Sequence, residues 1–450
     1  MDSQMRDRGG AVFSYRGIPP AGQLIPLGLQ HVVAAIVGIV TPAILVSNVC
    51  NLSPEDQTLL IQVSLIMTAL ATLLQLFPIF GRIGARLPVI MGTSFAYVPT
   101  LQVIGADFGL GAILGAELIG GLVAILFGVF VRQIRKFFPP LVTGTVIFTI
   151  GLSLYSTAIR YMASGANPAD PEQFGSLTNW VVALATFAVV LFCNHFARGT
   201  VKLGAILIGM AAGYLISIPL GMVSFDAVSS AGWFQLAVPG HFRMEFVPSA
   251  CVSLAIVYVV NAVQTIGDLS STTLGGMDRL PTDKELSGGI IGQGVISVVG
   301  SFFGGLPVAS YSQNVGIVTV NRVINRSVFA LASVVLLLAG LVPKFSSVLT
   351  TIPQSVIGGA TISVFAMITM TGMRMITSEP LTMRSCTVVG LSVALGMGVT
   401  LVSGSLAGPG FPDWVHTVFG SSSVVLSTLM AIFLNLILPK EKAPAEPAAK

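Results

Sequence analysis

The sequence has little charge. Asp, Glu, Lys and Arg together make up only 9% of the 450 residues, whereas 54% are hydrophobic. A soluble domain of this length carries charge on roughly a quarter of its residues, because its surface faces water. The shortage therefore excludes a water-soluble globular protein and indicates that most of the surface faces lipid.

Cysteines and catalytic motifs are also scarce. The four cysteines do not stand at the short paired spacing of a metal site. The chain has no H-E-x-x-H metal helix and no G-x-S-x-G nucleophile turn. We therefore do not expect an enzyme, and we expect no metal, no other cofactor and no nucleic-acid partner.

Long apolar stretches recur from end to end. A helix needs about 20 apolar residues to cross the hydrocarbon core of a bilayer. We therefore expect an all-α polytopic membrane protein with about fourteen spans. The predicted spans are 25–46, 57–78, 87–104, 110–131, 138–157, 177–196, 201–223, 248–272, 288–304, 306–321, 327–342, 355–373, 385–404 and 420–439.

Positive charges fall on one side of these spans. Every Lys and Arg except Arg160, Arg243 and Lys344 lies in a tail or loop that alternating spans place on the same face. Cytoplasmic loops carry an excess of Lys and Arg. We therefore expect cytoplasmic tails at 1–24 and 440–450, in a protein of the inner (plasma) membrane.

Two short motifs occur twice. Residues 87–89 and 306–308 both read Leu-Pro-Val, and residues 139–144 and 353–358 share Pro-x-x-Val-x-Gly. Both pairs have nearly the same spacing and lie in spans seven apart. A unit of seven spans is odd, so its second copy enters the membrane upside down, as in alternating-access carriers. The expected copies are 25–235 and 236–439.

The third and tenth spans, 87–104 and 306–321, look interrupted. Each combines Gly and Pro with several hydroxyl or amide side chains. Unwound backbone at membrane depth persists only where protein or a wet cavity satisfies its hydrogen bonds. We expect both spans to break near the midplane, beside a substrate site. The alternative is a pair of kinked packing helices.

Only two acidic residues, Glu117 and Asp268, fall within the predicted spans. Intramembrane carboxylates are costly and usually functional. Asp268 shares a helical face with Gln264 and Asn261, and we expect this polar face to look onto the cavity. Burial disfavours the charged form of a carboxylate. Asp268 is therefore expected to exchange a proton, to hold Na⁺, or merely to cap a broken helix.

The remaining polar residues have plainer interpretations. Glu117 lies beside small residues and is expected to bond across packed helices. His31 alone indicates a hydrogen-bonded packing residue, and Phe95 alone indicates a core residue. Gln293 is expected either to support the site or to form a simple interhelical bond.

Residues 313–322 carry the most specific pattern, Gln-Asn-Val-Gly-Ile-Val-Thr-Val-Asn-Arg. This run resembles the signature Q/E-N-x-G-x-x-x-x-T-R/K/G of the nucleobase–ascorbate transporters, which include bacterial uracil, xanthine and urate permeases. Asn321 stands where the signature has Thr. The resemblance extends over nearly the whole chain, and Gln30-His31 is also similar to members that handle xanthine or urate.

The resemblance implies a core domain and a gate domain, often in a homodimer. The base would lie between the eighth span and the broken third and tenth spans. Phe95 matches the aromatic residue that stacks on the base, and Gln313 and Asn314 match binding and coupling positions. Asp268 matches a polar position one turn beyond the main substrate contact.

Two positions depart from the family pattern. Gln264 stands where the family usually has a Glu that holds the base, and Gln293 stands where many xanthine carriers have Asp. A carboxylate only accepts hydrogen bonds, whereas an amide accepts and donates. Gln264 thus suits an N–H beside a C=O, as on the rim of xanthine, urate or uracil. Coupling then falls on Asp268, with Glu117 as a second candidate.

We therefore expect a secondary transporter that imports a nucleobase by symport with H⁺ and by elevator-type alternating access. A purine such as xanthine or urate is favoured over uracil, and Na⁺ is the other candidate ion. The alternative is an anion carrier or channel of the related sulfate-transporter architecture, which usually appends a cytoplasmic regulatory domain. The expected substrate-binding residues are Ser94, Phe95, Gln264, Ser312, Gln313 and Asn314. The expected coupling or supporting residues are His31, Glu117, Asp268 and Gln293.

Overall fold

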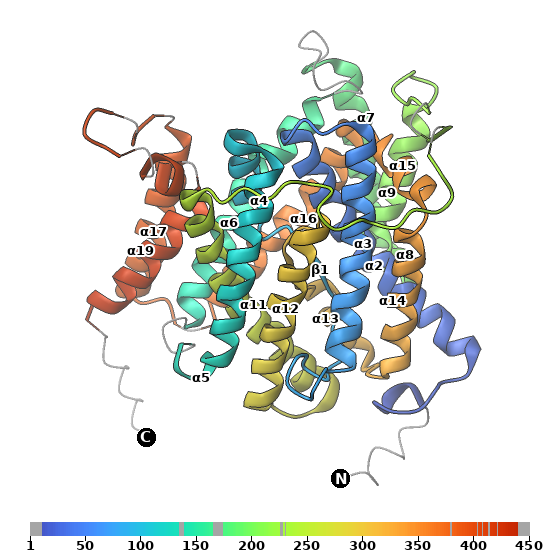
Figure 1. Cartoon of the computed structure of the whole chain (residues 1–450), viewed down its shortest axis with the longest axis horizontal. Helices are drawn as coiled ribbons and strands as arrows, with labels where there is room; N and C mark the ends of the chain where they lie inside the picture. Colours follow the sequence, from blue (N-terminus) through green and yellow to red (C-terminus); the bar gives the residue numbers. More distant parts are fainter. Residues whose placement is uncertain are drawn as a thin grey trace, which may run out of the picture.

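The computed structural model describes residues 11–134, 139–164, 174–225, 228–229, 231–378, 380–402, 404–406, 408–412, 415–420 and 422–439. Of the two predicted tails, residues 1–10 and 440–450 lie outside this range. The long helices run roughly parallel to one another, up and down through the bundle (Figure 1). The described chain begins at the lower edge of that view.

Helices account for nearly all of the regular structure. In chain order they are η1 (Ala11–Phe13), α2 (Ala21–Val49), α3 (Pro54–Leu76), α4 (Val98–Val129), α5 (Val131–Ile134), α6 (Pro140–Ala163), α7 (Leu177–Phe196), α8 (Thr200–Leu203), α9 (Ala205–Ser217), α11 (Pro248–Met277), α12 (Asp283–Phe303), α13 (Ser312–Asn321), α14 (Arg326–Gly340), α15 (Pro343–Thr350), α16 (Gln354–Ile376), α17 (Met383–Leu401), η3 (His416–Gly420) and α19 (Ser423–Ile437). Two short strands, β1 (Met91–Thr93) and β2 (Val308–Ser310), complete the fold.

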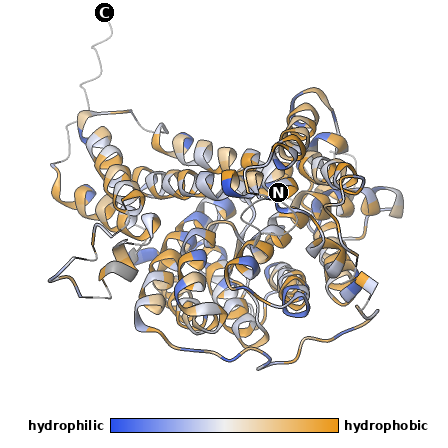
Figure 2. Cartoon of the chain, turned by 90° about the horizontal axis from the view of Figure 1, so that it is seen from above, coloured by the Kyte–Doolittle hydropathy of each residue, from blue (hydrophilic) through white to orange (hydrophobic). Residues whose placement is uncertain are grey.

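The surface of the bundle confirms a multi-pass membrane protein. Nine helices of the described chain are long and apolar enough to cross a bilayer, and the pair α14 and α15, bent by 79°, raises this to ten. Hydrophobic residues predominate around the outside when the bundle is seen from above (Figure 2). Large side chains such as Leu126, Phe192 and Leu436 are exposed there. Exposure of this kind is stable only against lipid.

The expected number of fourteen spans is not matched helix for helix. The predicted spans at 201–223 and 420–439 contain the shorter apolar helices α9 and α19. The spans at 87–104 and 306–321 are part strand and part helix. Helix α4 contains the end of the third predicted span and the whole body of the fourth, with a break at Gly109. There φ is 80°, a conformation that glycine adopts without steric cost.

Two groups of helices pack within the bundle. Helices α2, α3, α4, α11, α12, α13 and α14 pack mainly on one another and on the strands, and we call them the core group. Helices α6, α7, α9, α16, α17 and α19 form the second set of contacts, the gate group. The two groups correspond to the core and gate domains that the resemblance implies.

Helices α6 and α16 are the centre of the gate group, and they contain the repeated Pro-x-x-Val-x-Gly motif. The two helices begin after Pro139 and Pro353. A side chain at Gly144 would meet the backbone of Gly372, and a side chain at Gly358 would meet the backbone of α6 near Ala158. The motif glycines therefore make reciprocal close contacts, as two copies related by an inverted repeat would make.

Candidate functional site

The two interrupted spans meet at a short crossing of extended backbone. Strands β1 and β2 pair antiparallel, with Gly92 opposite Ala309. Side chains complete the pairing, because the Tyr311 hydroxyl donates to the Thr93 carbonyl and the Met91 amide donates to Thr72 Oγ1 at 3.2 Å. Each strand thus satisfies backbone hydrogen bonds of the other. This pairing allows non-helical backbone to persist within the membrane. The alternative of two kinked continuous helices is wrong.

A helix begins directly after each strand. Helix α4 starts at Val98 and α13 starts at Ser312, so the amino-terminal end of each lies beside the crossing. Free amide groups at a helix start carry partial positive charge and bind carbonyl oxygens or anions. Before α4 begins, the Ser94 hydroxyl accepts from the Ala96 amide at 3.2 Å, and the Val98 amide donates to the Phe95 carbonyl at 3.1 Å. Since Pro99 has no amide hydrogen to donate, the start of α13 is the richer in donors of the two.

That space is a cavity of about 230 Å³ between the core and gate groups. The core side supplies polar groups from the crossing, α11 and α13. The gate side supplies mainly apolar side chains from α6 and α16. The lining residues are Gly38, Ser94, Phe95, Ala96, Ile147, Ile150, Gln264, Ser310, Tyr311, Ser312, Gln313, Met367, Ile368 and Thr371.

The cavity brings together most of the predicted substrate-binding residues. Ser94, Phe95, Gln264, Ser312 and Gln313 all line it. The ring of Phe95 meets the edge of the Phe365 ring, with centroids 5.2 Å apart and planes at 80°. This contact holds Phe95 in place from the gate side. The result is an apolar ring facing a small set of amide and hydroxyl groups, as in small-molecule sites generally.

Asn314 does not line the cavity. Its side chain is buried and donates both to the backbone carbonyl of His31 and to His31 Nδ1, each at 3.1 Å. The His31 ring packs on Phe329, with centroids 4.3 Å apart. Asn314 and His31 therefore join α13 to α2 behind the cavity. His31 is a hydrogen-bonded packing residue, as its sequence context alone indicates.

Asp268 connects α11 to the crossing. Its two carboxylate oxygens accept hydrogen bonds from Ser310 at 2.5 Å and from Ser312 at 2.8 Å. Asp268 is only 8% exposed, and of the expected polar face only Gln264 reaches the cavity. Helix α11 runs through Asp268 without a break, so the residue caps neither end of that helix. Asp268 is instead linked to the cavity through Ser312, whose hydroxyl bonds to Asp268 and which also lines the cavity.

Gln293 has a complete set of partners. Its oxygen accepts from Thr265 at 2.8 Å, and its nitrogen donates to Asn261 at 2.7 Å and to the Tyr97 hydroxyl at 3.2 Å. Ser310 contacts Thr265 at 3.5 Å and so links this cluster to Asp268. Gln293 thus bridges α12, α11 and the start of α4, and lies outside the cavity.

Glu117 stands apart from the site. It is fully buried in α4, and neither carboxylate oxygen has a hydrogen-bond partner in the described part of the chain. The expected bond across helices is therefore absent. A Cβ at Gly300 of α12 would lie 3.6 Å from Glu117 Oε1, so α12 has no side chain at that point that could donate a hydrogen bond.

Several functional positions carry no signal in the sequence. Ser310 and Thr265 support Asp268 and Gln293, but isolated hydroxyl residues are common in membrane helices. Ile147, Met367 and Thr371 line the gate side of the cavity, and nothing distinguishes them from lipid-facing residues. The repeated Pro-x-x-Val-x-Gly motif was the one available pointer to α6 and α16.

Comparison with known proteins gives a consistent result. A family model described as a permease family matches residues 22–404. The uric acid permease PucJ of Bacillus subtilis is 33% identical over 421 residues, which cover 92% of each chain. The xanthine permease of Bacillus subtilis is 32% identical, over 92% of this chain and 94% of its own. The uric acid transporter UacT of Escherichia coli is also 32% identical, over 92% of this chain and 86% of its own.

Solved structures with the same fold are much more distant in sequence. The transmembrane domain of the cyanobacterial bicarbonate transporter BicA is 15% identical, with a TM-score of 0.60 over 92% of this chain and 97% of that one. The murine anion transporter Slc26a9 in its inward-facing state is 12% identical, with a TM-score of 0.61 over 95% of this chain and 70% of that one. At this level of identity the likeness shows the fold alone.

Proposed function

The chain belongs to the permease family whose model matches it, and from this premise we propose that it imports a nucleobase by ion-coupled symport. Because this family consists of permeases, the chain is a transporter rather than an enzyme. The proposed substrate is a purine such as xanthine or urate, with uracil as a further candidate. The observation that carries the proposal is the convergence of Ser94, Phe95, Gln264, Ser312 and Gln313 on one cavity.

The chemistry of the cavity suits a flat heterocycle. Phe95 supplies an aromatic face on which a base can stack. The side-chain amides of Gln264 and Gln313 supply hydrogen-bond donors and acceptors to the same cavity. The helix start at Ser312, which lines the cavity, favours carbonyl oxygens and negative charge. Xanthine and urate present several carbonyl and N–H groups around their rim, and the matched permeases are named for these bases.

Movement of the core group against the gate group would carry the base across the membrane. The cavity lies between the two groups, so a vertical shift of the core would expose it to each side in turn. In this proposal residues 25–235 and 236–439 are the inverted repeats, both tails are cytoplasmic, and the inner membrane is the location. We also propose a homodimer that holds the gate groups still.

Asp268 is the proposed coupling residue, with H⁺ as the ion and Na⁺ as the alternative. Its carboxylate accepts from Ser312, which itself lines the cavity. Protonation would convert an acceptor of two hydrogen bonds into a group that also donates, and would loosen α13 from α11. An anion carrier is the weaker candidate, because the likeness to anion transporters extends to the fold only.

Uptake of labelled xanthine, urate and uracil into cells that lack their own carriers tests the proposal. We expect saturable uptake of at least one purine by the wild type. The Phe95→Ala variant should raise KM about 5- to 150-fold, because stacking of a base on an aromatic ring contributes ~1–3 kcal/mol. Phe192→Ala, at a ring 61% exposed on the outer surface, is the matched control and should leave KM unchanged. Absence of saturable uptake for all three bases would refute the proposal.

A further inference from the structure

A second cavity, of about 330 Å³, opens far from the substrate site at the edge where α2 and α14 begin and α3 ends. Its lining residues are Tyr15, Arg16, Leu76, Phe77, Pro78, Arg86 and Arg326. Three of these seven are arginines, which come from three separate parts of the chain. None of these residues lines the substrate cavity.

The cavity is built by specific hydrogen bonds. The buried side chain of Asn325 donates to the carbonyls of Ala11, Ser14 and Gly17 at 2.9, 2.9 and 3.2 Å, and so fixes the segment before α2 against the start of α14. The Arg326 amide donates to the Tyr15 carbonyl at 3.2 Å. These contacts fix residues 15–16 and Arg326 side by side in the wall of the cavity.

Arg86 is positioned just as firmly. Its φ of 58° is rare for a residue other than glycine. Gln75 fixes the backbone on both sides of it: the side-chain oxygen accepts from the Ala85 amide at 2.8 Å, and the carbonyl accepts from the Leu87 amide at 3.3 Å. An unusual backbone conformation that is held in this way is frequently found at functional sites.

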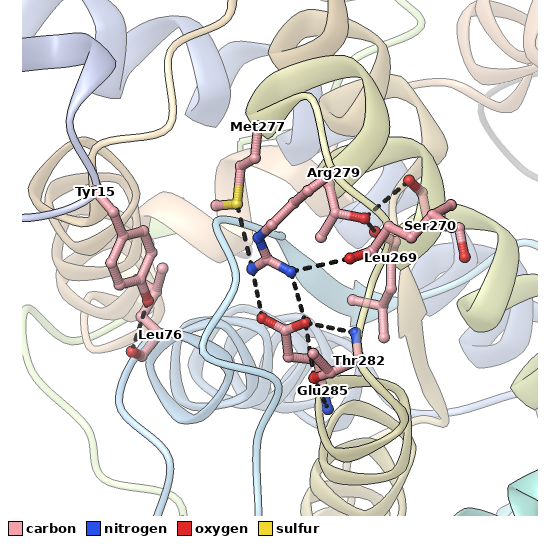
Figure 3. A network of polar contacts seen from close by, with 10 residues as sticks. Tyr15, Leu76, Leu269, Ser270, Met277, Arg279, Thr282 and Glu285 are labelled. Carbon is pink, nitrogen blue, oxygen red and sulfur yellow. Dashed lines mark hydrogen bonds and ion pairs between the residues drawn. The ribbon is translucent and has the colours of Figure 1, made fainter. Parts of the chain in front are cut away.

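The three arginines lack acidic partners. Arg132, Arg279 and Arg322 each form an ion pair, whereas Arg16, Arg86 and Arg326 form none within the described chain. Figure 3 shows the Tyr15 hydroxyl on the Leu76 carbonyl, at 3.1 Å, beside the Arg279–Glu285 network. Glu285, the nearby carboxylate, is occupied by Arg279 at 2.5 and 2.9 Å and by Thr282. Because Glu285 is already paired with Arg279, it does not neutralise the arginines of the cavity.

Uncharged groups only partly offset this charge. The carbonyl groups at the end of α3 carry about half a negative charge, against three full positive charges. Arg326 lies over the Phe77 ring, 5.4 Å from its centroid. Burial raises the pKa of Tyr15 to about 12, so that its hydroxyl remains a donor despite the nearby arginines. The cavity thus presents hydrogen-bond donors and a net positive charge.

Apolar side chains rim this positive cavity. The turn after α3 bends at Phe80 and Gly81, which have φ of 51° and 62°, between the bridged residues Ile79 and Ile83. The turn leaves Phe80 91% exposed, and Phe77 and Ile18 are exposed as well. Positive charge beside exposed apolar surface at a membrane edge is typical of sites for anionic headgroups.

We propose that this cavity is a phosphate-binding site, in which Arg16, Arg86 and Arg326 hold the phosphate group of an anionic phospholipid or of a soluble phosphorylated metabolite. Guanidinium groups bind phosphate through paired, charge-assisted hydrogen bonds, which suits three convergent arginines. Binding would tie the segment before α2 to α3 and α14, because each contributes one side of the cavity.

Two binding measurements on the purified full-length protein separate these sources. In the first, phosphatidylglycerol is titrated into protein held in phosphatidylcholine nanodiscs, and bound lipid is counted by native mass spectrometry. In the second, inorganic phosphate and adenosine monophosphate are titrated into the same nanodiscs, and the rise in thermal stability is measured. The variant is the double substitution Arg86→Gln with Arg326→Gln. The matched control is Arg82→Gln, which removes a charge from the same loop but outside the cavity.

We expect the wild type and Arg82→Gln to bind alike, and the double variant to bind at least roughly tenfold more weakly, since each charge-assisted bond lost costs about that factor. This pattern with phosphatidylglycerol assigns the site to a lipid headgroup, and with phosphate or adenosine monophosphate it assigns a soluble ligand. If the double variant is poorly folded by size-exclusion chromatography, Arg86→Gln alone should show the loss, and Arg86→Lys should bind more tightly than Arg86→Gln but more weakly than the wild type, because lysine keeps the charge and loses the paired hydrogen bonds. Equal binding by wild type, control and double variant in both measurements would overturn the proposal. It would mean that these arginines serve only to orient the protein in the membrane.

Discussion

The two buried carboxylates in the described part of the chain differ in their surroundings. Asp268 accepts hydrogen bonds from Ser310 and Ser312, and Ser312 reaches the cavity. Glu117 has no hydrogen-bond partner among the described residues and lies outside the cavity. A carboxyl group that exchanges a proton with a transported substrate must respond to that substrate, and only Asp268 has a contact through which it can respond.

Replacement of Asp268 by Asn tests this difference. Asn keeps an oxygen that accepts from Ser310 or Ser312 but cannot take up or release a proton. We expect Asp268→Asn to reach the membrane and to exchange labelled base across it, while accumulation against a gradient is lost. Uptake and counterflow in proteoliposomes measure the two activities separately.

Glu117→Gln is the matched control, because it makes the same chemical change at the carboxylate without cavity contact. We expect it to accumulate substrate at close to the wild-type level. Concentrative uptake by Asp268→Asn would show that Asp268 is not the coupling residue. Loss of accumulation in Glu117→Gln alone would move that role to Glu117.

The amide of Gln264 determines a second property of the site. A glutamate at this position can donate to a base only while protonated, and when ionised it repels an anionic base. We therefore expect Gln264→Glu to make uptake fall as the pH rises, and urate uptake to fall more than xanthine uptake. Uptake of both bases measured from pH 5 to pH 8 checks this, with Gln293→Glu, outside the cavity, for comparison. A pH profile identical to that of the wild type would mean that residue 264 does not contact the base.

At the scale of elements, the sequence predicts the interruptions but not what the unwound segments do. Clustered Gly, Pro and hydroxyl residues place the breaks within 87–104 and 306–321. The pairing of Met91–Thr93 with Val308–Ser310 joins chain segments more than two hundred residues apart, and no local pattern encodes such a partner. For the same reason Ser310 could not be assigned to Asp268 in advance, whereas Gln264, on a periodic helix, could be placed on the polar face.

The contact between α6 and α16 gives a prediction at this scale. A leucine at Gly144 would collide with the backbone of Gly372 and Ile376, which cannot move independently of α16. We expect Gly144→Leu to destabilise the protein by about 1–3 kcal/mol or more and to reduce uptake sharply, because both helices line the cavity. Thermal unfolding in detergent and base uptake measure the two effects.

Gly390→Leu on α17 is the matched control, because a side chain there meets nothing within 4 Å. It should leave both unfolding and uptake nearly unchanged, since leucine also favours a helix over glycine. If Gly144→Leu matched this control, close packing of α6 on α16 would not be needed for transport.

At the scale of the whole molecule, few polar contacts cross from the core group to the gate group. Asn48 donates to the Tyr161 hydroxyl at 3.2 Å, Thr157 donates to Gln102 at 3.1 Å, and the Thr100 and Ser422 hydroxyls lie 3.1 Å apart. A boundary with few hydrogen bonds can slide at low cost, whereas an interlocked one cannot. Composition and topology rules do not predict the two groups, because a boundary between packed helices leaves no local pattern in the sequence. Only the family resemblance predicts them.

A reversible crosslink across this boundary tests whether sliding accompanies transport. In a variant whose four native cysteines are replaced by serine, Thr100→Cys with Ser422→Cys places two thiols where two hydroxyls now lie 3.1 Å apart. We expect oxidation to reduce base uptake at least tenfold and dithiothreitol to restore it. The control pair, Thr149→Cys with Ser427→Cys, joins α6 to α19 within the gate group, where the hydroxyls lie 2.9 Å apart. Because those two helices would move together, its oxidation should leave uptake unchanged. Full-rate transport by the crosslinked Thr100–Ser422 pair would require a motion that leaves this boundary fixed, and the elevator mechanism would have to be abandoned.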